Sequence, residues 1–159
     1  MSEATVCICD ANVLIDFIEA DEDILHELTL YWTKVYVPTR VLHEVKELPP
    51  ERAEALGLHI IETPIELVAS AGLSGPDCAC LHFVLTEGWT CITNDKLLRR
   101  ACQREGGTVV WGLEMLLILV KAGQITAARA GGVAEKVSVL NPEITPFILD
   151  TFKKLLLSL

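Results

Sequence analysis

The stretch that decides the fold is Thr5-Val-Cys-Ile-Cys-Asp-Ala-Asn-Val-Leu-Ile-Asp16. Its first five residues form an unbroken run of strand length, which is typical of a central parallel strand buried on both faces. The following residues place Val13, Leu14 and Phe17 at helical spacing, which predicts a helix over residues 12–20. A buried strand that leads directly into a helix indicates a parallel α/β unit.

The same alternation continues along the chain. Further strands are expected at residues 35–37, 58–62, 89–93 and 108–110. Further helices are expected at residues 21–32, 39–47, 66–71, 74–87, 94–104, 113–122, 127–137 and 146–157, and Gly131-Gly132 is expected to interrupt the helix over 127–137. The sequence therefore predicts one α/β domain over residues 1–159, a three-layer α/β/α architecture with a central, mainly parallel sheet of about four to five strands.

Length and composition agree with this class. The chain has 159 residues, 51% of them hydrophobic, enough to bury a core without disulfides or a structural metal. These numbers exclude a disordered chain and a disulfide-stabilised miniprotein. The longest apolar run, Met115–Val120, is far shorter than the roughly 20 residues that span a bilayer, and the N-terminus lacks a basic signal region. We expect a soluble cytoplasmic protein without a membrane partner, whose six cysteines are buried free thiols.

The net charge of −9 is unevenly distributed. Residues 1–33 hold eight acidic residues and no Lys or Arg, whereas residues 34–159 hold fourteen acidic and thirteen basic residues. The total charge argues against a general nucleic-acid binder and favours a metal or a basic partner. It leaves room for one local RNA-binding track, which would consist of Lys96, Arg99, Arg100 and Arg104 on one helix face. A second candidate track consists of Lys34, Arg40 and Lys46.

Four carboxylates occupy informative positions. Asp10 and Asp95 follow predicted strands, Asp77 lies in the first turn of a predicted helix, and Glu44 lies within the predicted helix over 39–47. Ligands bind beyond the carboxyl ends of parallel strands, so all four can converge on one edge. Clustered carboxylates repel one another unless a cation lies among them, and Mg²⁺ or Mn²⁺ prefers such oxygen ligands. Each acid taken alone can equally be a helix cap or a surface residue.

Four short motifs carry a resemblance to a known family. They are Cys9-Asp-Ala-Asn-Val-Leu-Ile-Asp16, Val41-Leu-His-Glu-Val45, Leu73-Ser-Gly-Pro-Asp-Cys-Ala79 and Ile92-Thr-Asn-Asp-Lys-Leu-Leu-Arg-Arg-Ala101. In their order and spacing they resemble the PIN domains, which are metal-dependent ribonucleases. The resemblance implies that Mg²⁺ or Mn²⁺ is held by the catalytic residues Asp10, Glu44, Asp77 and Asp95. It also implies that Asn12 and Thr93 orient these carboxylates or the waters of the metal.

The resemblance is clearest over residues 4–125 and leaves residues 126–159 as a C-terminal helical extension. Ala11 stands where the family often has Ser or Thr, and Trp111 precedes Gly112 where smaller residues are commoner. The Trp111 departure is expected to alter only packing. The resemblance implies an endoribonuclease similar to VapC-type toxins, with RNA as substrate and an antitoxin protein as a possible partner.

Other interpretations remain open at this stage. A PIN-like scaffold can bind RNA or a protein without cleaving, and His43 beside Glu44 can reach the metal site. A haloacid-dehalogenase phosphatase is disfavoured because Asn12 replaces its second acid, and a receiver domain fits poorly. We expect a homodimer that uses either the C-terminal helix or the helix over residues 21–32. The C-terminal helix carries too many apolar residues for one narrow stripe: Phe147, Ile148, Leu149, Phe152, Leu155, Leu156, Leu157 and Leu159.

Overall fold

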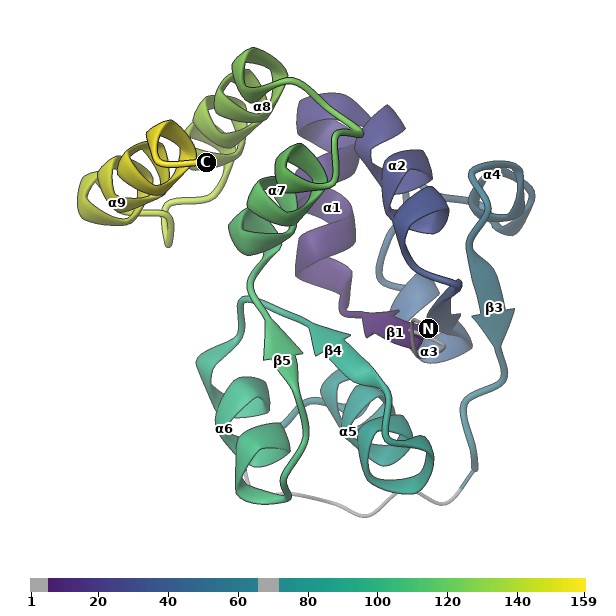
Figure 1. Ribbon diagram of the computed structural model, residues 1–159. Coiled ribbons are helices and arrows are strands. Elements are labelled where there is room, and N and C mark those ends of the chain that lie inside the picture. The colour runs from purple at the N-terminus through teal and green to yellow at the C-terminus, as the bar shows by residue number, and fades with distance from the viewer. Residues whose placement is uncertain (1–5, 66–71) are drawn as a thin grey trace.

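A computed structural model describes residues 6–65 and 72–159 of the chain. Across these residues the protein has one five-stranded sheet, in which every pairing is parallel and the strand order is β3-β2-β1-β4-β5 (Figure 1). The strands are β1 (Val6–Cys9), β2 (Lys34–Pro38), β3 (His59–Ile61), β4 (Thr90–Ile92) and β5 (Val109–Val110). The predicted parallel sheet is confirmed.

Helices cover both faces of the sheet. In the described ranges they are α1 (Ala11–Asp21), α2 (Asp23–Tyr31), α3 (Thr39–Leu42), α4 (Pro50–Ala55), α5 (Gly75–Glu87), α6 (Lys96–Arg104), α7 (Gly112–Lys121), α8 (Ala127–Leu140) and α9 (Pro146–Leu157). On one side α2 contacts both α1 and α7, and on the other side α3, α5 and α6 form a contiguous layer (Figure 1). Helices α8 and α9 pack outside α1 and α7. The predicted three-layer α/β/α architecture is therefore confirmed.

The centre of the core is β1. Cys7, Ile8 and Cys9 are completely buried, because β2 and β4 flank the strand and helices cover both of its faces. Such continuous burial explains why the strand reads as an apolar run rather than as an alternating one. All six cysteines are buried free thiols, as expected. Within residues 6–65 and 72–159, no helix is long and apolar enough to cross a membrane.

The predicted helix over residues 39–47 is wrong. Helix α3 ends at Leu42, and tight turns follow, in which Glu44 N donates to Val41 O at 3.0 Å and Val45 N donates to Leu42 O at 3.0 Å. Successive three-residue turns place Leu42, Val45 and Leu48 on the same buried side. Helix α4 was not predicted; it begins at Pro50, where the absent N–H of proline costs no hydrogen bond.

The expected interruption of α8 is also wrong. This helix runs without a break through Gly131 and Gly132. Each glycine costs a helix about 1 kcal/mol, but α8 buries Ala130, Val133, Ala134 and Val137 against its neighbours, and this burial maintains it. The expected helix over residues 66–71 lies outside the described residues. The remaining predicted elements are confirmed, with ends that differ by at most two or three residues.

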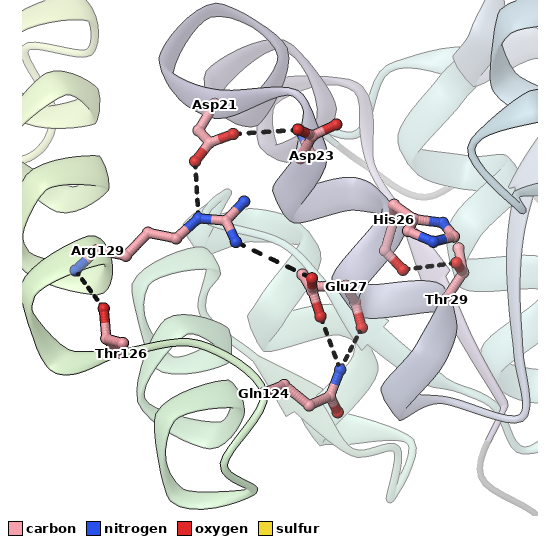
Figure 2. A network of polar contacts seen from close by, with 8 residues as sticks. All are labelled: Asp21, Asp23, His26, Glu27, Thr29, Gln124, Thr126 and Arg129. Atoms are coloured by element: carbon pink, nitrogen blue, oxygen red, sulfur yellow. Dashed lines mark hydrogen bonds and ion pairs between the residues drawn. The ribbon is translucent and has the colours of Figure 1, made fainter.

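Polar contacts tie α8 to the acidic N-terminal helices (Figure 2). Arg129 Nε donates to Asp21 Oδ2 at 3.0 Å, and its Nη1 lies 4.0 Å from Glu27 Oε2. Gln124 Nε2 donates to the backbone oxygen of Glu27 at 3.0 Å and to its Oε1 at 3.2 Å. Part of the negative charge of the first 33 residues therefore holds the C-terminal helices in place.

Candidate functional site

The candidate site lies where β1 and β4 run side by side and end. Strands β2 and β3 extend the sheet from β1 in one direction, and β5 extends it from β4 in the other. The strand order therefore reverses between β1 and β4, and the crevice beyond such a reversal is the usual ligand site of an open parallel sheet. Asp10 follows β1 directly, and Thr93, Asn94 and Asp95 follow β4. The fold thus brings three of the predicted site residues, Asp10, Thr93 and Asp95, to the expected edge.

Asp10 is fixed by two hydrogen bonds. Its Oδ1 accepts from Val13 N at 3.0 Å, which caps α1, and its Oδ2 accepts from the Thr93 hydroxyl. The side chain is 2% exposed. Thr93 Oγ1 also accepts from Asp95 N at 3.0 Å, so Thr93 connects the acid after β1 to the acid after β4. Thr93 therefore contacts both acids, and its role in orienting them on an ion stays a prediction.

Asp95 and Asp77 lie at the starts of two helices. Asp95 caps α6, where its Oδ1 accepts from Leu98 N at 2.9 Å. Asp77 lies in the first turn of α5, and its backbone N donates to Ser74 Oγ at 3.2 Å. Asp10 and Asp95 are therefore helix caps as well as candidate metal ligands. Because a cap needs only one carboxylate oxygen, the capping contacts neither require nor exclude metal binding.

The electrostatics of this edge show that the carboxylates affect one another. Burial raises the pKa of Asp10 to about 7, against the opposing hydrogen bonds from Thr93 and Val13 and with a further rise from the charges of Asp77 and Asp95. Burial also raises the pKa of Asp77, and the charges of Asp95 and Glu44 add to the rise. Among residues 6–65 and 72–159, the four acids at this edge have no Lys or Arg as an ion-pair partner.

The donor chemistry of the edge fits a hard divalent cation. All four candidate ligands are carboxylates, the preferred ligands of Mg²⁺ and Mn²⁺. Each Asp10 oxygen accepts one hydrogen bond and keeps a free lone pair. Within residues 6–65 and 72–159, however, no three His, Cys, Asp or Glu side chains are grouped as the ligands of an ion. The oxygens suit Mg²⁺, which keeps several waters and needs only one or two carboxylates directly.

Glu44 and Asn12 are more exposed than the other candidate residues of the metal site. Glu44 is exposed in the turn after α3, yet it is close enough to Asp77 for its charge to act on that side chain. Asn12 is exposed in the first turn of α1, and its side chain makes no hydrogen bond among the described residues. Its predicted role in orienting the carboxylates therefore has no contact to support it among the described residues.

The basic residues of α6 lie on the side opposite to its buried residues Leu98, Ala101 and Cys102. Lys96, Arg100 and Arg104 are exposed. Arg99 is half-buried, and its Nη1 donates to Thr93 O at 3.4 Å. The helix begins at Asp95, so this basic face adjoins the candidate site.

Two further residues, Arg40 and Trp111, make contacts at this end of the molecule that their sequence positions did not indicate. Arg40 packs against the first turn of α5, where a Cβ added to Gly75 would lie 3.0 Å from Arg40 Nη1. Trp111 was expected to affect only packing, but the residue is 40% exposed, and the Arg99 guanidinium carbon lies 3.6 Å from the centroid of its ring. The only sequence signal was the size of Trp111 beside Gly112, because both contacts join residues that are distant along the chain.

A scan of the sequence against models of protein families found no match, and a search among curated proteins found no relative. The functional interpretation therefore depends on the residues at the β1–β4 edge and on the four short motifs that contain them.

Proposed function

We propose that the protein is an endoribonuclease of the PIN type that hydrolyses RNA phosphodiester bonds with Mg²⁺ or Mn²⁺. The observation that carries the proposal is the buried carboxyl of Asp10 at the strand-order reversal. It has no cationic partner among the described residues, and the charges of two further carboxylates act on it. A buried acid in this setting destabilises a fold unless a cation compensates it. A divalent ion is the natural compensation at an all-oxygen site.

The residues at this edge have separate roles in the proposal. Asp10, Asp77 and Asp95 would hold the ion, with Glu44 at the exposed side. The Thr93 hydroxyl restrains Asp10 and accepts a hydrogen bond from the backbone of Asp95, so the two carboxylates are positioned before an ion binds. When bound, Mg²⁺ or Mn²⁺ supplies a water of lowered pKa and stabilises charge on the phosphate. No side-chain nucleophile is required.

The experiment is cleavage of a labelled RNA with Mn²⁺, with and without a chelator. We expect Asp10→Asn to reduce the rate at least about a hundredfold, the scale on which a main contributor to transition-state stabilisation acts. The matched control is Asp16→Asn, because Asp16 is also a buried acid of α1 but contacts Asn141 instead of the candidate site. Cleavage that persists both in the chelator and in Asp10→Asn would contradict the proposal.

A non-catalytic scaffold that binds RNA or a protein is the second candidate. It is favoured by the finding that the described residues hold no group of three metal ligands. A titration with Mn²⁺ distinguishes the nuclease from the scaffold. A nuclease should gain thermal stability with Mn²⁺ and then cleave RNA, whereas a scaffold should bind its partner with no response to Mn²⁺.

The resemblance to VapC-type toxins extends the proposal to a cellular role. Expression of a toxin should arrest growth, and co-expression of a small neighbouring antitoxin gene should restore it. The Asp10→Asn variant should not arrest growth. Undisturbed growth with the wild-type chain would favour a processing nuclease.

A further inference from the structure

A groove extends from the candidate site along the C-terminal part of the molecule. Its volume is about 960 Å³, and it lies between the start of α6, the start of α7, and α9. Asp95, Lys96 and Arg99 line it on the α6 side, Trp111 lies at the start of α7, and Phe147 lines it on the α9 side. Asp95 lines this groove and is also one of the candidate metal ligands, so the groove opens beside the candidate site.

Trp111 is a preformed aromatic surface in this groove. The Arg99 guanidinium stacks on the indole at 3.6 Å from its centroid, an attractive cation–π contact. The backbone N of Trp111 donates to Glu114 Oε1 at 3.1 Å, which fixes the residue at the N-terminus of α7. The Arg99 guanidinium restrains the indole and the Glu114 hydrogen bond restrains the backbone, and the residue is still 40% exposed, so it can accept a flat ligand with little loss of side-chain entropy.

The charged side chains are unevenly distributed along the groove. Lys96 and Arg99 lie at the end that contains Asp95, and Glu143 lies on the α9 side. Glu114 is engaged by the backbone of Trp111. A ligand that matches this arrangement has an anionic group beside the carboxylate cluster and an aromatic group a short distance away, as a nucleotide of RNA does.

We propose that this groove binds a base of single-stranded RNA next to the scissile phosphate, with the base stacked on the Trp111–Arg99 pair. The inference rests on the proposed ribonuclease function and names its substrate class. Stacking uses the π-face that every base has, so the groove would select unpaired bases without selecting a sequence. In a duplex both faces of a base are covered by neighbouring pairs, and the protein should therefore prefer single strands.

The test measures binding of a labelled single-stranded RNA octamer to the full chain in a chelator, where cleavage does not interfere. One aromatic stack contributes about 1–3 kcal/mol, so we expect Trp111→Leu to weaken binding about 5- to 150-fold. Trp111→Phe keeps an aromatic ring and should remain within about threefold of the wild type. Tyr31→Leu is the control, because Tyr31 is 39% exposed but lies in α2, outside the groove.

A set of octamers in which each base in turn is removed distinguishes stacking from a general effect on the surface. At one position, removal of the base should weaken wild-type binding and abolish the difference between wild type and Trp111→Leu. Full-strength binding by Trp111→Leu, or a reduction that is the same for every octamer, would overturn the inference. Failure of the wild type to bind the octamer would also overturn the inference, and a peptide would then be the next ligand to test in the groove.

A second assay with the wild-type and Tyr31→Leu proteins tests the nuclease proposal independently of base stacking. Bis(4-nitrophenyl) phosphate is a phosphodiester without a base, and the wild-type and Tyr31→Leu chains should hydrolyse it with Mn²⁺. Absence of that hydrolysis contradicts the nuclease proposal, whereas the octamer measurements in chelator decide base stacking independently.

Discussion

Replacement of Asp10 by Asn should stabilise the metal-free protein, and the gain should increase with pH. The side chain of Asp10 is 2% exposed, and burial is the main reason that its pKa rises from 3.8 to about 7. Asn has nearly the same shape, and its Oδ1 can still accept from Val13 N. The substitution therefore removes the charge while it keeps the cap of α1.

The sign follows from proton linkage. A carboxyl with a higher pKa in the folded than in the unfolded state holds its proton longer when folded, so stability falls as pH rises from about 4 to about 7 and then levels off. The difference between 3.8 and about 7 corresponds to an upper limit of about 4 kcal/mol above pH 7. The Asn variant does not carry this penalty. In a chain of this length, each kcal/mol changes Tm by roughly 2–4 °C.

The assay is thermal unfolding in a chelator at pH 4, 6 and 8. We expect nearly equal Tm values for wild type and Asp10→Asn at pH 4 and a higher Tm for the variant at pH 8. Asp150→Asn is the control, because Asp150 is exposed on α9 and its removal should give no such trend. A variant that is less stable than the wild type at pH 8 would refute the argument that Asp10 is a buried, uncompensated acid.

Three further predictions concern other surfaces. Arg99→Ala combined with Arg100→Ala should weaken the salt dependence of RNA binding. The magnitude of the slope of log binding constant against log salt concentration should fall by roughly 0.7 for each phosphate that the variant no longer neutralises, and an unchanged slope would place the RNA elsewhere. Leu157 of α9 is 87% exposed, and we expect a dimer that Leu157→Asp weakens. A monomeric wild-type mass by light scattering at micromolar concentration would contradict this expectation. Arg129→Ala should lower the free energy of unfolding by about 1 kcal/mol, less in high salt, and a decrease that does not depend on salt would count against its ion pairs (Figure 2).

The fold was predictable where the local sequence pattern matches the burial of the segment in the structure. The apolar run of β1 and its direct passage into α1 needed no knowledge of distant residues. Residues 39–47 were mispredicted because buried positions three residues apart, Leu42, Val45 and Leu48, fit successive turns as well as a helix. The break expected at Gly131 did not occur, because burial of one face of α8 outweighs the intrinsic cost of glycine.

The candidate site was predictable in its position but not in its details. The exits of β1 and β4 follow from sequence order alone, so Asp10 and Asp95 could be assigned to one edge. The bridge that Thr93 makes between them, the exposed ring of Trp111, and the approach of Arg40 to α5 depend on contacts between distant segments. No spacing along a single chain encodes such contacts.

Binding of Mn²⁺ tests the central claim, a divalent-cation site at the carboxyl ends of β1 and β4, most directly. Free Mn²⁺ gives an electron paramagnetic resonance signal that broadens on binding, so a titration at about pH 7.5, above the raised pKa of Asp10, counts bound ions and measures their affinity. We predict that the wild type binds at least one ion per chain, that Asp10→Asn weakens this binding at least about tenfold, and that Asp150→Asn leaves it unchanged. Wild-type protein that leaves the free Mn²⁺ signal undiminished, or that binds no better than Asp10→Asn, would contradict the account.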